Sequence, residues 1–178
     1  MKPHVERITK LDAARRQLRT AVRMFFEEKD TVSTYTLAAA AEGVLAGILR
    51  KQGGTHPIRD GDFIRPEYKK QFWRLLDRPR NFFKHADRDP DDVLEFNPEV
   101  VASALLECAI LYHHCTGRAL REGSAFAVWF SIHHPNILKP GPFKTFIEGL
   151  KAKAPDADDG KSAFLHGLDR ADLWPNTD

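Results

Sequence analysis

Apolar residues recur at steps of three and four over most of residues 1–118, the spacing that places them on one face of an α-helix. The first series contains Leu11, Leu18 and Phe25 and predicts an amphipathic helix with its arginines on the polar side. A second series lies between Val32 and Lys51 and contains four consecutive alanines, which allow helices to pack closely. No segment of useful length alternates with the two-residue period of a β-strand. The pattern therefore predicts an all-α fold.

Prolines, glycines and capping residues mark the ends of the predicted helices. Pro66 suits the first position of a third helix. Pro79 lacks a backbone donor, so the chain either kinks there or begins a new helix capped by Asp77. Asn97-Pro98-Glu99 is typical of the start of a long fourth helix, which Gly117 would end. We expect these four main helices to run antiparallel as a four-helix up-down bundle.

Composition divides the chain into three parts. Residues 1–120 form the predicted bundle. Residues 121–153 contain two short helical segments, 124–132 and 143–153, separated by three prolines, and are expected to be accessory helices packed on the bundle. Residues 154–178 carry six aspartates against one lysine and one arginine, with few apolar residues. We expect this last part to be an acidic, mobile tail.

Charge and cysteine content limit the class of protein. The 178 residues carry a net charge of only +2, but residues 1–23 hold seven basic and two acidic residues, and residues 50–88 hold eleven and five. These segments form either a phosphate-binding face or a solvated helix surface. Cys108 and Cys115 are seven residues apart on one predicted helix, too far for a disulfide. The sequence lacks a signal peptide or an apolar run of about 20 residues, so we expect a cytoplasmic, bacterial-type protein without membrane contact.

One motif, Arg80-Asn81-Phe82-Phe83-Lys84-His85, combines groups suited to phosphate chemistry. Histidine titrates near neutral pH and moves protons, whereas arginine stays charged and braces a phosphate through two parallel hydrogen bonds. Arg50 and His56 have a similar spacing, but only the Arg80 motif combines an adjacent amide, an aromatic pair and flanking helices. Residues five apart on a regular helix point about 140° away from each other. Arg80 and His85 therefore need an irregular backbone or a second chain to meet.

The segment from Val5 to Arg118 resembles the HEPN superfamily of helical nucleotide-binding domains. That family's motif is Arg, four to six residues, then His, often with a polar residue directly after the Arg, as in Arg80, Asn81 and His85. The resemblance implies a helical bundle that pairs as a homodimer, so that two copies of the motif face one groove. It also implies a metal-independent endoribonuclease of the toxin or phage-defence type.

Under this hypothesis each motif residue has a role in RNA cleavage. His85 moves the proton of the attacking 2′-hydroxyl, Arg80 braces the phosphate, and Asn81 orients His85 or a phosphate oxygen. The products would be a 2′,3′-cyclic phosphate and a 5′-hydroxyl. Glu42 lies in an apolar helix, where it either pairs with Arg80 and orients it or reaches solvent at the edge of the helix face.

Several neighbouring residues complete the hypothesis. Arg78 and Lys84 flank the motif and contact either RNA or water, and Tyr112 is expected to border the groove. The adjacent pairs His113-His114 and His133-His134 diverge by about 100° on a helix, so no metal site is expected. No phosphate-binding loop or dinucleotide-binding glycine set is evident, so no cofactor is expected either.

Two further functions stay open beside the ribonuclease. The first is a non-catalytic helical dimer of the same fold that binds RNA, a nucleotide or a protein. The second is a structural or regulatory scaffold in which the helices after residue 121 bind a partner. An antitoxin is one expected kind of protein partner.

Overall fold

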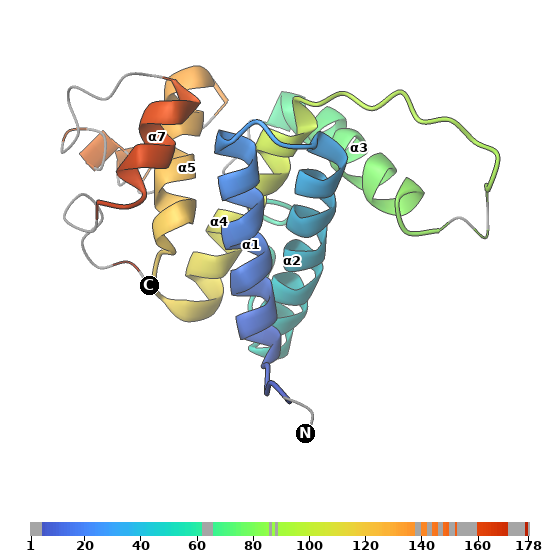
Figure 1. Cartoon of the computed structure of the whole chain (residues 1–178), viewed down its shortest axis with the longest axis horizontal. Helices are drawn as coiled ribbons and strands as arrows, with labels where there is room; N and C mark the ends of the chain where they lie inside the picture. Colours follow the sequence, from blue (N-terminus) through green and yellow to red (C-terminus); the bar gives the residue numbers. More distant parts are fainter. Residues whose placement is uncertain are drawn as a thin grey trace.

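The computed structural model describes residues 5–61, 66–85, 87, 89–137, 140–141, 144–145, 148–149, 152, 160–170 and 177. Within this part of the chain the helices are α1 (Lys10–Phe26), α2 (Thr31–Lys51), α3 (Pro66–Phe82), α4 (Val100–Thr116), α5 (Arg121–His133) and α7 (Lys161–Gly167). The one β interaction among these residues is an isolated parallel bridge between Ala119 and Thr177. The described fold is all-α, as the hydrophobic pattern predicts (Figure 1).

Local sequence signals place several helix ends. Thr9 and Asp12 form a capping box at the start of α1. Asp30 caps α2, because its carboxylate accepts a hydrogen bond from the backbone N–H of Ser33 at 2.7 Å. Gly117 ends α4 in the left-handed conformation, with φ of 69°. The end at Gly117 confirms the boundary predicted for the fourth helix.

Helices α1, α2, α4 and α5 pack around one hydrophobic core. Leu18, Leu45, Leu105 and Phe126, one from each helix, are fully buried. Helices α2 and α4 run in the same direction, since the Cys108 thiol lies 2.9 Å from the carbonyl oxygen of Ala38, and the Cys115 thiol lies 3.3 Å from that of Leu45. Both cysteines are free.

The parallel course of α2 and α4 agrees with the expected up-down order, in which the second and fourth helices run the same way, but α3 does not occupy the place expected for it in the bundle (Figure 1). The segment between them, which includes α3, leads back across the molecule, so that α4 begins at the end of the bundle where α2 also begins (Figure 1). Helix α5 then runs antiparallel to α4 beside α1. The fourth position in the bundle therefore belongs to α5, and α3 projects to one side.

Helix α3 continues through Pro79 to Phe82, so of the two alternatives given for Pro79, a new helix capped by Asp77 is wrong. Only three residues of the helix follow the proline. The end of α3 is attached to the bundle by aromatic contacts, because Tyr35 and Phe83 lie edge to face with ring centres 5.8 Å apart, and Phe96 packs against both rings. The Tyr35 hydroxyl also donates to the carbonyl oxygen of Leu76. These contacts position the Arg80 motif in the last turn of α3 and just beyond it.

The described residues after α4, residues 121–137 and 160–170, are more closely packed than their composition predicts. Helix α5 begins three residues earlier than expected, where Gly123 lies against Ala109 of α4 and leaves little space for a side chain. Residues 160–170, placed in the mobile tail by composition, instead include α7, whose Phe164 stacks on Phe26 at 5.6 Å. Leu168 is fully buried as well. Most of the helix expected at residues 143–153 lies outside the described residues.

Helix α2 is long and apolar enough, by length and composition, to cross a membrane, although no apolar run of that length was expected from the sequence. It packs here against α1 and α4, and its residues Tyr35, Ala38, Ala41 and Leu45 are buried in the shared core. A core helix of a soluble protein passes the same test, because an alanine-rich helix buried by its neighbours needs few charged residues. The packing of α2 is that of a core helix.

Candidate functional site

Arg80 points from the last turn of α3 to two buried carboxylates. Its Nη1 lies 3.0 Å from Oε2 of Glu42 on α2, and its Nη2 lies 3.5 Å from Oε2 of Glu107 on α4. Both glutamates are buried, and the Arg80 side chain is only 16% exposed. Of the two alternatives left open for Glu42, pairing with Arg80 is therefore correct. Glu107 lies within the apolar series of α4, and the spacing of that series did not indicate it as a site residue.

The loop after α2 adds His56 and Arg59 to these groups. His56 Nε2 lies 3.4 Å from Glu42 Oε1 and 3.2 Å from Glu107 Oε1. The Arg59 guanidinium binds the Asp77 carboxylate at 2.7 Å. Six side chains thus form what we call the buried charge cluster: Glu42, His56, Arg59, Asp77, Arg80 and Glu107.

The protonation of His56 depends on opposing influences. Burial alone would lower the pKa of His56, but the adjacent carboxylates of Glu107 and Glu42 outweigh it and raise the pKa to about 9. The backbone N–H of Arg59 donates to His56 Nδ1 at 3.1 Å, a contact that requires this nitrogen to be unprotonated. Without His56 the cluster holds three carboxylates and two guanidinium groups, so its charge favours the protonated ring. We conclude that the pKa of His56 is raised and that the contact with Arg59 limits the rise.

The carboxylate of Glu42 is affected in the opposite sense. Burial would raise the pKa of Glu42, but the hydrogen bond with His56 and the charges of Arg80 and Arg59 together lower it. Glu42 therefore stays ionised at neutral pH, although it is buried. Its charge keeps the guanidinium of Arg80 in place.

A hollow of about 510 Å³ opens beside this cluster, between α2, the loop that follows it and α3. Its lining includes four side chains that carry or can carry positive charge, and two carboxylates: Arg50, His56, Arg59, Arg80, Glu42 and Asp60. Arg50 and His56 have a spacing similar to that of Arg80 and His85. The structure brings these two residues to the same hollow as Arg80. That spacing was the signal by which sequence reasoning could have included His56.

The remaining motif residues lie apart from the hollow. Asn81 is exposed in the last turn of α3, and His85 follows the helix end with 42% of its side chain exposed. Within the part of the chain that the structure describes, His85 Nδ1 lies 4.0 Å from the carboxylate of Asp87. Among the described residues, the hydrogen bonds and ion pairs of Arg80 do not include Asn81 or His85. One chain therefore brings Glu42 and Arg80 together but does not bring His85 to Arg80.

The predicted flanking residues differ in exposure. Arg78 and Lys84 are exposed and accessible to a ligand. Tyr112 is 2% exposed and packs in the core, so the expectation that it borders the groove is wrong. Its position on α4 faces the bundle because α4 is covered by α2 and α5.

Glu42, His56 and Glu107 offer ligand atoms within 4.8 Å of one another, close enough to hold a metal ion. Arg80 and Arg59 already compensate the charges of these carboxylates, however. A cation would have to displace a guanidinium group and the His56 proton. The arrangement suits ion pairs better than a metal centre.

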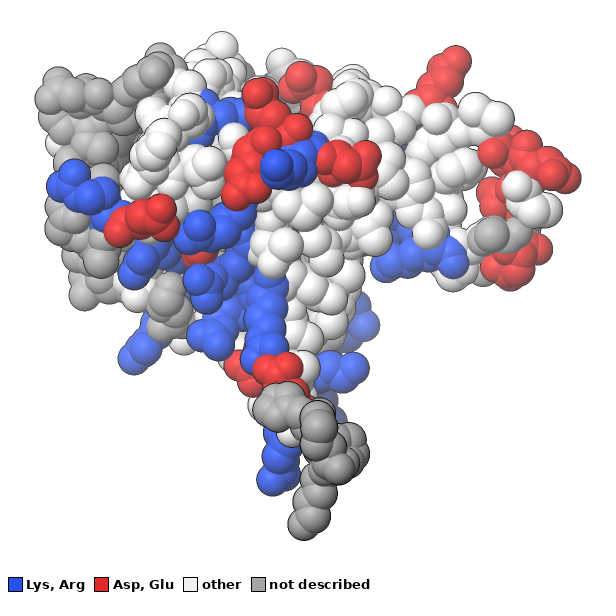
Figure 2. All heavy atoms as spheres, viewed as in Figure 1, with Lys and Arg blue, Asp and Glu red and all other residues white. Residues whose placement is uncertain are grey.

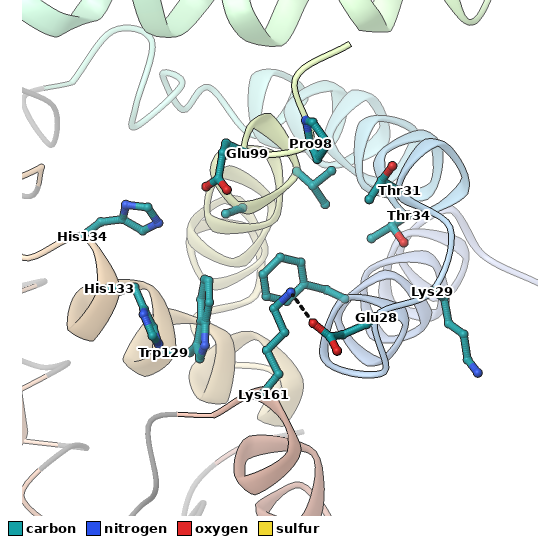
Figure 3. A pocket seen from close by; sticks show the side chains of 13 residues that line it. Glu28, Lys29, Thr31, Thr34, Pro98, Glu99, Trp129, His133, His134 and Lys161 are labelled. Atoms are coloured by element: carbon teal, nitrogen blue, oxygen red, sulfur yellow. Dashed lines mark ion pairs between the residues drawn. The ribbon is translucent and has the colours of Figure 1, made fainter.

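A second hollow, of about 490 Å³, lies at the end of the bundle where α2 and α4 begin (Figure 3). Lys161 reaches across the Phe25 ring, 4.3 Å from its centre, to the carboxylate of Glu28 at 3.5 Å. His133 lies against Trp129, with ring centres 4.4 Å apart. This hollow contains no residue of the Arg80 motif; of its two lysines, Lys161 is paired with Glu28, and Lys29 points away from the hollow (Figure 3). The hollow beside Arg80 is therefore the better candidate for binding a phosphate.

No protein-family model matches this chain, and comparison with curated proteins and with solved structures finds no match.

Proposed function

We propose that the chain is a metal-independent endoribonuclease that binds RNA in the hollow beside Arg80 and acts as a homodimer. The observation that carries the proposal is the position of Arg80, which two buried carboxylates hold in the wall of an open hollow lined by further cationic side chains. A phosphodiester is the anion that such a lining suits. By this proposal the protein belongs with the toxin or phage-defence ribonucleases of the cytoplasm.

Arg80 is suited to stabilise a phosphorane. A guanidinium group has five N–H donors in a rigid plane, and the contacts with Glu42 and Glu107 use only part of them. The Nε of Arg80 is buried without a hydrogen-bond partner. Because the carboxylates fix the orientation of the group, little reorganisation is needed when charge develops on the phosphate oxygens.

The proton transfers are assigned to two histidines from different chains. His85 of one chain accepts the proton of the 2′-hydroxyl as this oxygen attacks phosphorus. His56 of the other chain donates a proton to the 5′-oxygen as the P–O5′ bond breaks. His56 lines the hollow and His85 does not, so this assignment requires a homodimer in which the exposed end of one α3 reaches the partner's hollow. The products are a 2′,3′-cyclic phosphate and a 5′-hydroxyl.

One observation favours the alternative, a non-catalytic helical dimer that binds RNA, a nucleotide or a protein. Arg80 is mostly buried and contacts three carboxylates, because Asp77 also lies 3.7 Å from its Nη1. A purely structural role, attaching α3 to the bundle, would use the same contacts. Binding without cleavage would then be the expected behaviour.

Cleavage of end-labelled single-stranded RNA in excess EDTA separates the two functions. We expect wild type to cleave, and His85→Ala, His56→Gln and Arg80→Lys to lose cleavage while circular dichroism shows them folded. His166→Ala, which removes an exposed histidine on α7, is the matched control and should cleave like wild type. Binding by folded wild type without cleavage supports the alternative, and equal cleavage by every variant indicates a contaminating nuclease.

Mixing two inactive variants tests the shared site. A mixed dimer of His85→Ala and His56→Gln has one hollow with both histidines intact, so random re-pairing should restore about a quarter of wild-type activity. No recovery in a mixture that has demonstrably exchanged subunits would contradict the assignment of the histidines to different chains.

A further inference from the structure

Basic side chains gather on a second face of the molecule, over α1 and the adjoining start of α5 (Figure 2). Arg15, Arg19 and Arg23 follow one another at four-residue steps and so form a row along α1. The lining of the hollow beside Arg80 includes no residue of α1 or α5. This row is therefore a separate surface.

A buried carboxylate organises two arginines of the row. Glu122 on α5 is 1% exposed, and its Oε1 accepts from the Nε of Arg19 at 3.2 Å and from the Nε of Arg23 at 3.3 Å. The two arginine side chains are 48% and 35% exposed. Glu122 thus holds two like-charged side chains next to each other at the surface. We call Arg19, Arg23 and Glu122 the arginine clamp.

The contacts with Glu122 leave most donors of the clamp for a ligand. They use the single N–H of each Nε, whereas the two Nη atoms of a guanidinium carry four of its five donors. Asp169 lies 3.7 Å from one Nη of Arg23, but its own side chain is 80% exposed. With Arg15 and the adjacent Arg121, four guanidinium groups face three carboxylates, those of Glu122, Asp169 and Asp12, which leaves a local excess of positive charge.

Arg121 adds positive charge beside the clamp, and the side chains along α1 do not suit a membrane surface. Arg121 precedes Glu122 on α5 and donates to the carbonyl oxygen of Leu168 at 3.3 Å. Among the described residues, no large apolar side chain is exposed between Arg15 and Arg23. A helix that lies on a membrane surface needs such side chains beside its basic ones. The surface suits a soluble polyanion.

We propose that the arginine clamp binds the phosphodiester backbone of single-stranded RNA outside the hollow. The choice of RNA rests on the function proposed above, whereas the anion site rests on the geometry around Glu122. Contact with the backbone gives affinity and orientation but no sequence preference. The clamp therefore determines how strongly the strand is held, and the hollow determines where it is cut.

The test is the affinity for a fluorescein-labelled oligouridylate, measured by anisotropy over a series of salt concentrations, with every protein carrying His85→Ala so that the RNA stays intact. Arg19→Gln/Arg23→Gln is compared with Lys70→Gln/Arg74→Gln, which removes the same charge from exposed positions on α3. We expect the clamp variant to bind roughly tenfold more weakly and its salt slope to fall by about 1.4, for two lost phosphate contacts. The α3 control should change affinity less than about twofold.

A further variant separates loss of RNA binding from loss of the fold. Arg19→Gln/Arg23→Gln/Glu122→Gln also removes the buried carboxylate that would otherwise lack its partners, and it should show the same weakened binding. Equal effects of the clamp and α3 variants, or no RNA binding by the parent protein, overturn the inference. If the protein binds RNA but does not cleave it, the ribonuclease proposal fails, whereas RNA binding and the dependence of that binding on Arg19 and Arg23 remain.

Discussion

Removal of the Arg80 guanidinium should destabilise the fold severely. Arg80→Met keeps much of the side-chain volume but leaves Glu42 and Glu107 buried with only His56 and Arg59 to compensate them. The reason for the instability is desolvation, because a buried carboxylate that loses its partner keeps the cost of leaving water.

The magnitude follows from the geometry. Nη1 and Nη2 of Arg80 lie 3.0 Å and 3.5 Å from oxygens of two glutamates that are at most 5% exposed. Loss of one partner from such a buried pair costs about 3–5 kcal/mol, and we expect Arg80→Met to fall in this range. Arg80→Lys keeps the charge but cannot reach both carboxylates in one plane, so its cost should be about 1–3 kcal/mol.

Urea denaturation followed by circular dichroism measures the free energy of unfolding of each variant. Arg74→Met is the matched control, since Arg74 is exposed on the same helix, and its effect should stay within about 0.5 kcal/mol. If Arg80→Met were no more destabilising than Arg74→Met, Arg80 would not hold α3 to the bundle, and the buried charge cluster would lose its structural basis.

Three further predictions address the cluster, the core and a helix end. Because the folded-state pKa of His56 is raised to about 9 from 6.5, its stabilising contribution is fully present below pH 6.5 and is lost as the pH rises through 9. The loss is at most about 3 kcal/mol, and parallel pH profiles for the unfolding of wild type and His56→Gln would contradict it. Phe126→Ala should cost about 3–5 kcal/mol in urea denaturation, since this ring is fully buried among other aromatic rings. A change below about 1 kcal/mol would show that the α1–α5 interface is not packed as described. Asp30→Ala should cost about 1 kcal/mol by loss of the cap on α2, whereas Asp30→Asn should restore most of it, and an equal loss for both variants would exclude capping as the cause.

The sequence by itself determined the helices and many of their ends. Asp30 and Gly117 act through their own side chain or backbone on residues within one helical turn, so their effect can be predicted without the rest of the molecule. The apolar spacing likewise predicts which face of α1 is buried, because the period of a helix is a local property. Glu42 was identified in the same way, as a carboxylate out of place on an apolar helix.

Tertiary structure alone decided how these helices are arranged. The exclusion of α3 from the bundle depends on the path of the segment between α2 and α4, which the spacing of apolar residues does not encode (Figure 1). For the same reason α5 was assigned to the periphery, although Phe126 and Phe130 are buried in the bundle. By sequence, Pro79 permitted either a kink or a new helix. In the structure one helix continues through Pro79, and Phe83 just beyond its end packs on Tyr35.

The candidate site was the part least accessible to sequence reasoning. Glu42 and Glu107 are 65 positions apart, and His56 and Arg80 come from a loop and a third helix. Each of these side chains alone has an ordinary solvated interpretation. Only the folded chain removes the two carboxylates from water, and that desolvation makes their pairing with Arg80 and His56 necessary.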